Sequence, residues 1–595
     1  MKYTKKSSVL YFGIIFIWLS LLACFGNDLT QVFRDAQVFA NLNSGYKKTL
    51  VPIASVIVVT LIAYFWLNGL KDIFYTVIYW LIPQKSKFAS TQIKYGKLGY
   101  AAKVGLIYTV CDDFDPQSLK KCLNQDYPNN LLTYYILDDS KTYDSKERVD
   151  IFAKKNNIKV IRRSSNKGYK AGNINNWLYQ NKNYDEFFVL LDSDEIIPND
   201  FVSKSIQYFT YSNVSIVQAN HISTRNYTKF ADLFSCGVES HWITYQAIKD
   251  RFGFLSLLGH GAMLRTEDVK KVGGFPEVVA EDLALSIKLS EINKKVVFAK
   301  DIMCEETYPV DYFAFKKRHT KWTMGNMEFI KKFSGLFFSK KLRWFEKVDI
   351  LLFVYNLPLT IFFIFFLLIH LLLFPFLGFT PVYAKSLLLP TILTLIAPLL
   401  NDLIYCFGKK GVIGYIRYFI STIVLYGSLY FISFWSAIKA LFGQAVFLVT
   451  PKVSEKYSIL NSILKNRGEI LFGSALIYIS FLINQVWSVI LIIIPSFLSV
   501  SLGLLGNKVN PEINHFLKKM YQTIGTILVI TGTLIGINSS FLLSKVVGVN
   551  SYEVKNHKKN KGLEKIEKQI TPENVNKVNK CINNILNGEG VLKCK

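Results

Sequence analysis

Apolar residues gather in long blocks near both ends of the chain, whereas the middle alternates short apolar runs with polar stretches. The first two blocks, Val9–Gly26 and Val51–Leu70, are each long enough to cross roughly 30 Å of hydrocarbon. No clear signal-peptide cleavage site separates them, so we expect a transmembrane hairpin. Further apolar blocks follow the middle segment: Leu351–Phe379, Ser386–Phe407, Val412–Leu441, Ile470–Leu505 and Thr523–Leu543.

The segment from Lys103 to Ile330 has the pattern of a soluble α/β domain. Its short β-rich runs are separated by helix-like polar segments, which predicts βαβ units and a parallel sheet covered by helices. Asp115-Pro116 is a suitable cap and first-turn pair for the helix after the first strand. The predicted strands are Val104–Val110, Thr133–Leu137, Lys159–Arg162, Phe187–Leu191 and Ser215–Gln218.

Composition supports a membrane protein. The 595 residues are 51% hydrophobic and carry a net charge of +27. Lys and Arg beside membrane spans account for this charge without nucleic acid, so we expect a lipid bilayer as partner and no nucleic acid. Five lysines after the second block place that side in the cytoplasm: Lys85, Lys87, Lys94, Lys97 and Lys103. The block Val412–Leu441 contains Arg417 and Lys439, and we interpret it as interfacial helices.

Charged residues follow the predicted strands and suit a nucleotide. Acidic strand ends offer acceptors to a nucleoside, and a lysine at a helix N-terminus suits a diphosphate. Asp192 and Asp194 face one side of an extended chain, where both could bind a divalent cation. Taken alone, this pair is more often a solvated turn. The motifs, in chain order, are Asp112-Asp113, Asp138-Asp139, Lys167–Asn173, Asp192-Ser193-Asp194, Gly259-His260-Gly261, Ala280-Glu281-Asp282 and Arg318–Trp322.

These motifs, in this order, resemble the GT-A domain of glycosyltransferase family 2. The membrane-embedded branch of that family includes bacterial cellulose synthase, hyaluronan synthase and poly-N-acetylglucosamine synthase. The resemblance covers about Lys103 to Lys452 and implies a Rossmann-like parallel sheet inserted between transmembrane helices. It implies seven regions: a transmembrane hairpin (1–82), the GT-A domain (83–330), an interfacial helix (331–348), transmembrane and interfacial helices (349–446), a gating loop (447–468), C-terminal transmembrane helices (469–544) and a Lys-rich tail (545–595).

The resemblance also assigns roles to residues. Asp282 matches the general base of the family's Thr-Glu-Asp motif, with Ala280 in place of Thr, and Asp192 and Asp194 match the metal-binding DxD motif that holds Mg²⁺ or Mn²⁺. The residues that it implies for nucleotide-sugar binding are Asp113, Asp139, Lys170, Asp192, Asp194, Arg318, Lys321, Thr450 and Lys452. Those implied for the acceptor are Trp322, Gly259, His260 and Glu281.

Two family motifs bear on polymer synthesis. Arg318-x-x-Lys321-Trp322 stands where the family reads Gln-x-x-Arg-Trp, and lysine cannot clamp a phosphate bidentately as arginine does. The stretch Phe447–Lys452 matches the gating loop of cellulose synthases. Trp322 could instead be an interface anchor, and His260 a hydrogen-bonded supporting group. Cys581 and Cys594 form either an extracytoplasmic disulfide or free thiols.

The sequence therefore predicts an inverting, metal-dependent synthase of the cell membrane with a cytoplasmic catalytic domain. We expect it to polymerise and secrete an extracellular or capsular polysaccharide of β-linked sugars. Its expected donor is UDP-glucose or UDP-N-acetylglucosamine, and its acceptor a glycan or a lipid. One alternative is a transferase that adds a single sugar to a membrane lipid. A second is a catalytically idle membrane scaffold or transporter.

Overall fold

The computed structural model describes residues 8–82, 102–180, 185–223, 228–356, 359–443, 445–446, 448–451, 455, 457–482 and 490–505. The expected tail (545–595), Cys581, Cys594, the apolar block Thr523–Leu543, Phe447 and Lys452 lie outside these residues.

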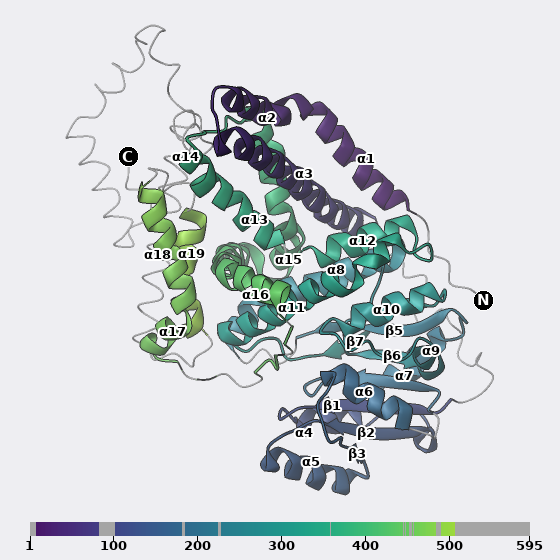
Figure 1. The fold of residues 1–595 in the computed structure, drawn as a ribbon. Coiled ribbons are helices and arrows are strands. Elements are labelled where there is room, and N and C mark those ends of the chain that lie inside the picture. The colour runs from purple at the N-terminus through teal and green to yellow at the C-terminus, as the bar shows by residue number, and fades with distance from the viewer. Residues whose placement is uncertain are drawn as a thin grey trace, which may run out of the picture. The chain divides into compact units, whose positions relative to one another are not determined.

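Seven strands form one mixed sheet (Figure 1) in the order β3-β2-β1-β4-β6-β5-β7. The first four strands pair in parallel, as expected, and β7 is parallel to β5. The short strand β6 runs antiparallel between β4 and β5, so the sheet is not wholly parallel. The strands are β1 (Val104–Val110), β2 (Leu132–Asp138), β3 (Lys159–Ile161), β4 (Phe187–Leu191), β5 (Val214–Ile222), β6 (Ala262–Arg265) and β7 (Lys295–Glu305).

The sheet is buried on both faces because successive side chains of a strand point to opposite sides. In β4, Phe187, Val189 and Leu191 join one apolar core, and Phe188 and Leu190 join the other. The helices of the first face are α4 (Pro116–Cys122), α5 (Tyr143–Asn156) and α7 (Phe201–Tyr208). Those of the second face are α6 (Tyr169–Gln180), α9 (Thr266–Lys271) and α10 (Glu281–Glu291). The expected cap of α4 is confirmed, since the Gln117 N–H donates to the Asp115 carboxylate at 3.0 Å.

Two further helices of this domain extend past the sheet. They are α8 (Lys229–Phe252) and α11 (Tyr312–Phe333). The single helix expected over 331–348 is wrong: α11 ends at Phe333, a short 3₁₀ turn follows, and α12 (Trp344–Val354) begins a new helix. Gly335 and two serines, Ser334 and Ser339, occupy this break, and these residues favour turns over helix interiors.

Apolar helices flank the domain. In the described residues, two helical stretches are long and apolar enough to cross a membrane, Tyr46–Leu81 and Lys385–Phe442. A third results if α1 (Val9–Cys24) and α2 (Gly26–Asn41), bent by 54°, count as one span. The remaining helices are α3 (Tyr46–Leu81), α13 (Leu359–Leu368), α14 (Phe374–Leu377), α15 (Leu388–Ser428), α16 (Tyr430–Phe442), α17 (Ile459–Lys465), α18 (Arg467–Leu482) and α19 (Ile490–Leu504).

Gly411 separates two helical parts of α15. Its φ of +68° interrupts the helix between the two apolar blocks distinguished in the sequence. Beyond the break, α16 packs against α11, and His319 and Ser433 hydrogen bond at 2.7 Å. Whether the part after Gly411 lies at the membrane interface stays a prediction.

Buried charges connect the apolar helices to the α/β domain. The fully buried Asp349 of α12 pairs with Lys249 of α8 at 3.1 Å and accepts a hydrogen bond from Tyr75 of α3 at 3.0 Å. We expect Asp349→Ala to destabilise the protein by about 3 kcal/mol because it removes the buried carboxylate that pairs with Lys249 and accepts from Tyr75. The midpoint of thermal unfolding of the purified protein, compared with that of the wild type, measures this loss of stability. The double variant Lys249→Met/Asp349→Leu should unfold at a higher temperature than Asp349→Ala, and an equal or lower midpoint would contradict the ion-pair argument.

Candidate active site

The carboxyl ends of β1, β2 and β4 meet at one edge of the sheet, because these strands are parallel neighbours. Open α/β sheets bind ligands at this edge. Asp113, after β1, accepts the Cys111 N–H at 2.8 Å and the Ser193 hydroxyl at 2.5 Å. The loop after β1 is therefore joined to the Asp192-Ser193-Asp194 loop after β4.

Asp139 is held by an arginine that the sequence analysis did not identify. Arg163, after β3, binds both carboxylate oxygens of Asp139, at 2.8 Å from Nε and 2.6 Å from Nη2. The adjacent Arg162 binds Asp138 at 2.7 Å. The sequence does carry a signal for these two ion pairs. Two consecutive arginines follow β3, and two consecutive aspartates stand at the end of its parallel neighbour β2.

Asp192 and Asp194 lie in a tight turn after β4, so the expectation of an extended chain is wrong. The Glu195 N–H bonds back to the Asp192 carbonyl at 3.2 Å. Asp192 forms an ion pair with Lys170, and its side chain is 35% exposed. The buried carboxylate of Asp194 accepts the Thr307 N–H at 3.1 Å. Oxygen donors of this kind suit Mg²⁺ or Mn²⁺, and Asp192 is accessible from solvent. The donor set therefore fits the expected cation.

Lys170 is the second residue of α6 and connects three parts of the site. Besides Asp192, its ammonium donates to the Gly259 carbonyl at 2.7 Å. Burial disfavours the charged form, but Asp192 and Glu281 outweigh it and raise the pKa of Lys170. Gly259 has a φ of +91°, and a Cβ there would lie 3.7 Å from Oδ2 of Asp282. Lys170, Asp192, Gly259 and Asp282 are thus neighbours.

Glu281 and Asp282 open α10 as a pair of carboxylates. The Leu283 N–H donates to Asp282 at 2.7 Å. Burial raises the pKa of both groups, and repulsion from Asp282 contributes to the value of about 8 for Glu281. Near neutral pH, Glu281 therefore retains its proton beside Asp282.

Helix α11 adds cations to the same site. Burial lowers the pKa of Lys321 to about 8, while Asp192 and Glu281 oppose that shift by attraction. The Arg318 guanidinium lies 4.3 Å from the centroid of the Trp322 ring, and the Trp322 side chain is 40% exposed. Thr450 is half-buried, and among the described residues no hydrogen bond joins it to this cluster.

A buried network supports the loop that carries Gly259. Glu195 contacts His260 Nδ1 at 3.0 Å and His221 Nε2 at 2.7 Å. The other nitrogen of His260 faces Glu306 at 3.4 Å. Burial opposes protonation of His260, but Glu195 raises its pKa to about 9. Both ring nitrogens therefore face carboxylates, which favours the supporting role for His260 over acceptor contact.

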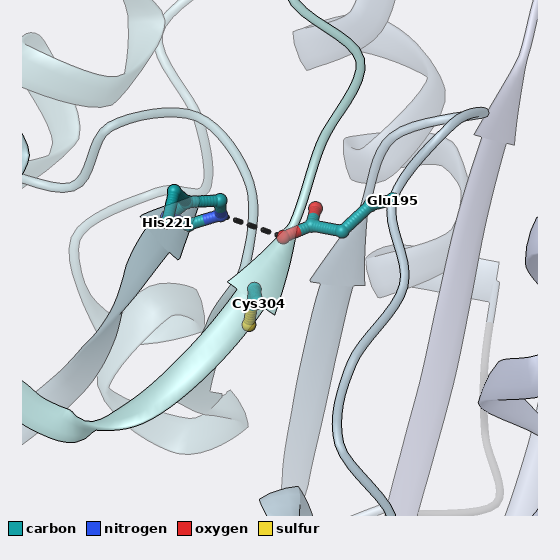
Figure 2. A group of neighbouring side chains, drawn as sticks. All are labelled: Glu195, His221 and Cys304. Atoms are coloured by element: carbon teal, nitrogen blue, oxygen red, sulfur yellow. Dashed lines mark hydrogen bonds and ion pairs between the residues drawn. The ribbon is translucent and has the colours of Figure 1, made fainter. Parts of the chain in front are cut away.

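Figure 2 shows Glu195 pointing towards His221 of β5, with Cys304 of β7 beside them. Their ligand atoms lie within 4.8 Å of one another, close enough to share a metal ion. All three side chains are completely buried, however, and Glu195 already bonds to both His221 and the Cys304 thiol. The solvent-accessible edge at Asp192 therefore stays the predicted site for the expected cation. Neither Glu195 nor His221 was predicted from the sequence.

The fold and the site together define an α/β domain with a charged sheet edge whose residue types suit a nucleotide diphosphate. Residues 187–434 match the family described as Glycosyl transferase family group 2. The chain thus contains a family 2 glycosyltransferase domain, and the expected family and fold class are confirmed.

The relatives that the chain matches are distant in sequence. The chain is 26% identical over 219 residues to "Probable glucomannan 4-beta-mannosyltransferase 7" of Oryza sativa subsp. japonica, covering 35% of this chain and 37% of that protein. It is 24% identical over 248 residues to "Cellulose synthase catalytic subunit [UDP-forming]" of Pseudomonas fluorescens, covering 40% and 33%. The matched part therefore spans about a third of the length of these relatives.

Among solved structures, the chain matches a mannosyltransferase from Pyrobaculum calidifontis in complex with GDP-Man and Mn²⁺. It is 15% identical, with a TM-score of 0.41, and the match covers 65% of this chain and 98% of that one.

Proposed function

We propose that the protein is an inverting, metal-dependent glycosyltransferase that builds a polysaccharide of β-linked sugars from a nucleotide-sugar donor. The observation that carries this proposal is the convergence of Lys170, Asp192 and Asp282 beside Gly259, with Lys321 close enough to feel the charge of Asp192. Named relatives that make glucomannan and cellulose support polymer synthesis. Apolar helices on both sides of the domain support a multi-pass protein of the cell membrane with a cytoplasmic catalytic site.

In this mechanism the diphosphate of the donor binds Lys170 and Lys321, and Asp113 and Asp139 contact the nucleoside. Asp192 and Asp194 would hold Mg²⁺ or Mn²⁺, which supplies positive charge as the diphosphate leaves. Asp282 takes the proton of an acceptor hydroxyl. The hydroxyl oxygen bonds to the anomeric carbon as the bond from that carbon to the diphosphate breaks, and the anomeric configuration inverts. The exposed Trp322 offers a face on which the acceptor sugar stacks.

A small set of sugar nucleotides are the candidate donors. We favour UDP-glucose or UDP-N-acetylglucosamine, and the names of the mannosyltransferase relatives add GDP-mannose to the candidates. The test is to incubate the purified full-length chain with each donor and Mn²⁺ and to size the product. A long glycan supports the proposal. A single sugar on a lipid would establish the non-processive alternative, and no transfer from any donor would contradict the proposal.

We expect kcat/KM for the donor to fall above about pH 8. There Lys321, whose pKa burial lowers to about 8, loses its positive charge, and Glu281, whose pKa burial raises to about 8, becomes negative. Both changes weaken binding of an anionic diphosphate. In Lys321→Arg the guanidinium stays charged, so kcat/KM for the donor at pH 9 should exceed the wild-type value several-fold, with little difference at pH 7. Lys317→Arg on the same helix is the control. Parallel pH profiles for wild type and Lys321→Arg would contradict this prediction.

A further inference from the structure

Arg163 connects two loops of the donor site that are separate in the sequence. Its Nε and Nη2 bind the carboxylate of Asp139. Its Nη1 donates to the Lys167 carbonyl at 2.6 Å, and Nη2 also donates to the Tyr169 carbonyl at 2.7 Å. A guanidinium has five N–H donors, and these four bonds use four of them. Arg163 is therefore mainly bound to the protein itself and has little capacity to clamp a phosphate.

The second loop is a strained turn that leads directly into Lys170. Gly168 and Tyr169 both have positive φ, +71° and +49°, and this conformation is uncommon for a side chain as large as tyrosine. Such a conformation persists only where its surroundings hold it. The guanidinium of Arg163 binds the carbonyls of Lys167 and Tyr169, on either side of Gly168, and so holds this turn.

Two more observations show that the assembly is tightly built. The Asn166 side-chain amide donates to the Asp139 carbonyl at 3.2 Å, a second link between the same loops. A Cβ on Gly172 would collide with the Lys167 carbonyl and with the Arg163 guanidinium. The side chains of Arg163 and Asp139 are only 10% and 9% exposed. Arg163 therefore packs into one unit with the loop after β2, which carries Asp139, and with the turn before Lys170.

We propose that Arg163 is a positioning residue that sets the spacing between Asp139 and Lys170. These residues are the proposed nucleoside and diphosphate contacts, so the inference rests on the proposed function. Arg163 acts through both of them and touches neither the acceptor nor the reacting carbon. Its loss therefore weakens donor binding more than it slows the chemical step.

Arg162 is a matched control because it also follows β3 directly. Its guanidinium also binds an aspartate at the end of β2, Asp138, at 2.7 Å, and it pairs with Asp150 of α5 at 2.9 Å. Its remaining bond goes to the Lys146 carbonyl, also on α5. Arg162 thus has the same chemistry as Arg163 and the same neighbouring loop, but it has no contact with the turn before Lys170.

The experiment compares Arg163→Lys with Arg162→Lys in the purified full-length protein. Lysine keeps the charge but cannot form the two-pronged contact or reach both carbonyls. We expect Arg163→Lys to raise the donor KM, and the Kd of the corresponding nucleoside diphosphate (UDP or GDP) measured with Mn²⁺, by roughly tenfold. The value of kcat should change less than threefold and the acceptor KM should not change. Arg162→Lys should change each constant less than twofold.

Equal donor KM values for the two variants would overturn the inference, as would a fall in kcat at unchanged KM. Should Arg163→Lys fail to fold, Arg163→Ala is assayed with millimolar guanidinium. Restored donor affinity, absent with methylammonium, supports positioning, and failure of rescue overturns it. An inactive wild-type protein that binds neither nucleotide would count against the proposed function. An active wild type with unaffected Arg163 variants would count against this inference alone.

Discussion

Asp282→Asn is expected to lower kcat about 10³-fold while leaving donor KM within about twofold. An amide cannot accept the proton of the acceptor hydroxyl, yet it retains the shape of the carboxylate and the oxygen that accepts the Leu283 N–H. In the proposed mechanism donor binding depends on Lys170, Lys321 and the cation, which this change leaves in place. The measurement is initial-rate kinetics with the donor identified by product sizing.

The control for Asp282→Asn is Glu267→Gln, an exposed carboxylate of α9 outside the cluster. It should retain wild-type kcat. If Asp282→Asn kept more than about a tenth of wild-type activity, Asp282 would not be the base. Full function of that variant would favour the scaffold or transporter alternative.

Asp192→Asn is expected to weaken activation by Mn²⁺ roughly 100-fold, because a neutral amide replaces the accessible carboxylate of the proposed cation site. Lys170 also loses its ion-pair partner. The measurement is the Mn²⁺ concentration for half-maximal activity, together with direct Mn²⁺ titration in the presence of UDP or GDP.

Asp200→Asn is the matched control for this change. Asp200 follows the same strand and forms only a partly exposed ion pair with Lys204, so its Mn²⁺ dependence should equal that of the wild type. Unchanged Mn²⁺ dependence in Asp192→Asn would contradict the assignment and would direct attention to the buried Glu195, His221 and Cys304.

The strands with continuous apolar runs could be predicted from the sequence. Val104–Val110 and Phe187–Leu191 form over the expected residues because a run buried on both faces needs apolar side chains at every position. Strands β6 and β7 were missed. The first has only four residues, and the second contains Lys300 and Asp301, which break its apolar pattern.

The local backbone of the site could not be predicted. The alternation rule for strands suggested that Asp192 and Asp194 share a face, but β4 ends at Leu191 and the chain turns. The two carboxylates consequently bind different partners, Lys170 and Thr307. Whether a chain stays extended past the end of a strand depends on neighbouring loops, here the one that begins after β1.

By itself, the sequence determined the class of domain, its position between apolar helices, and most of the charged residues that the fold brings together. Those properties depend on local patterning and on motif order, which a linear chain displays directly. Only the tertiary structure decided which groups pair: Arg163 with Asp139, Glu195 with two histidines, and Lys170 with Asp192. Pairing, burial and the resulting shifts in pKa depend on distances between residues far apart in the chain. For that reason the folded protein, rather than the order of motifs, decides how the charged groups of the site are arranged.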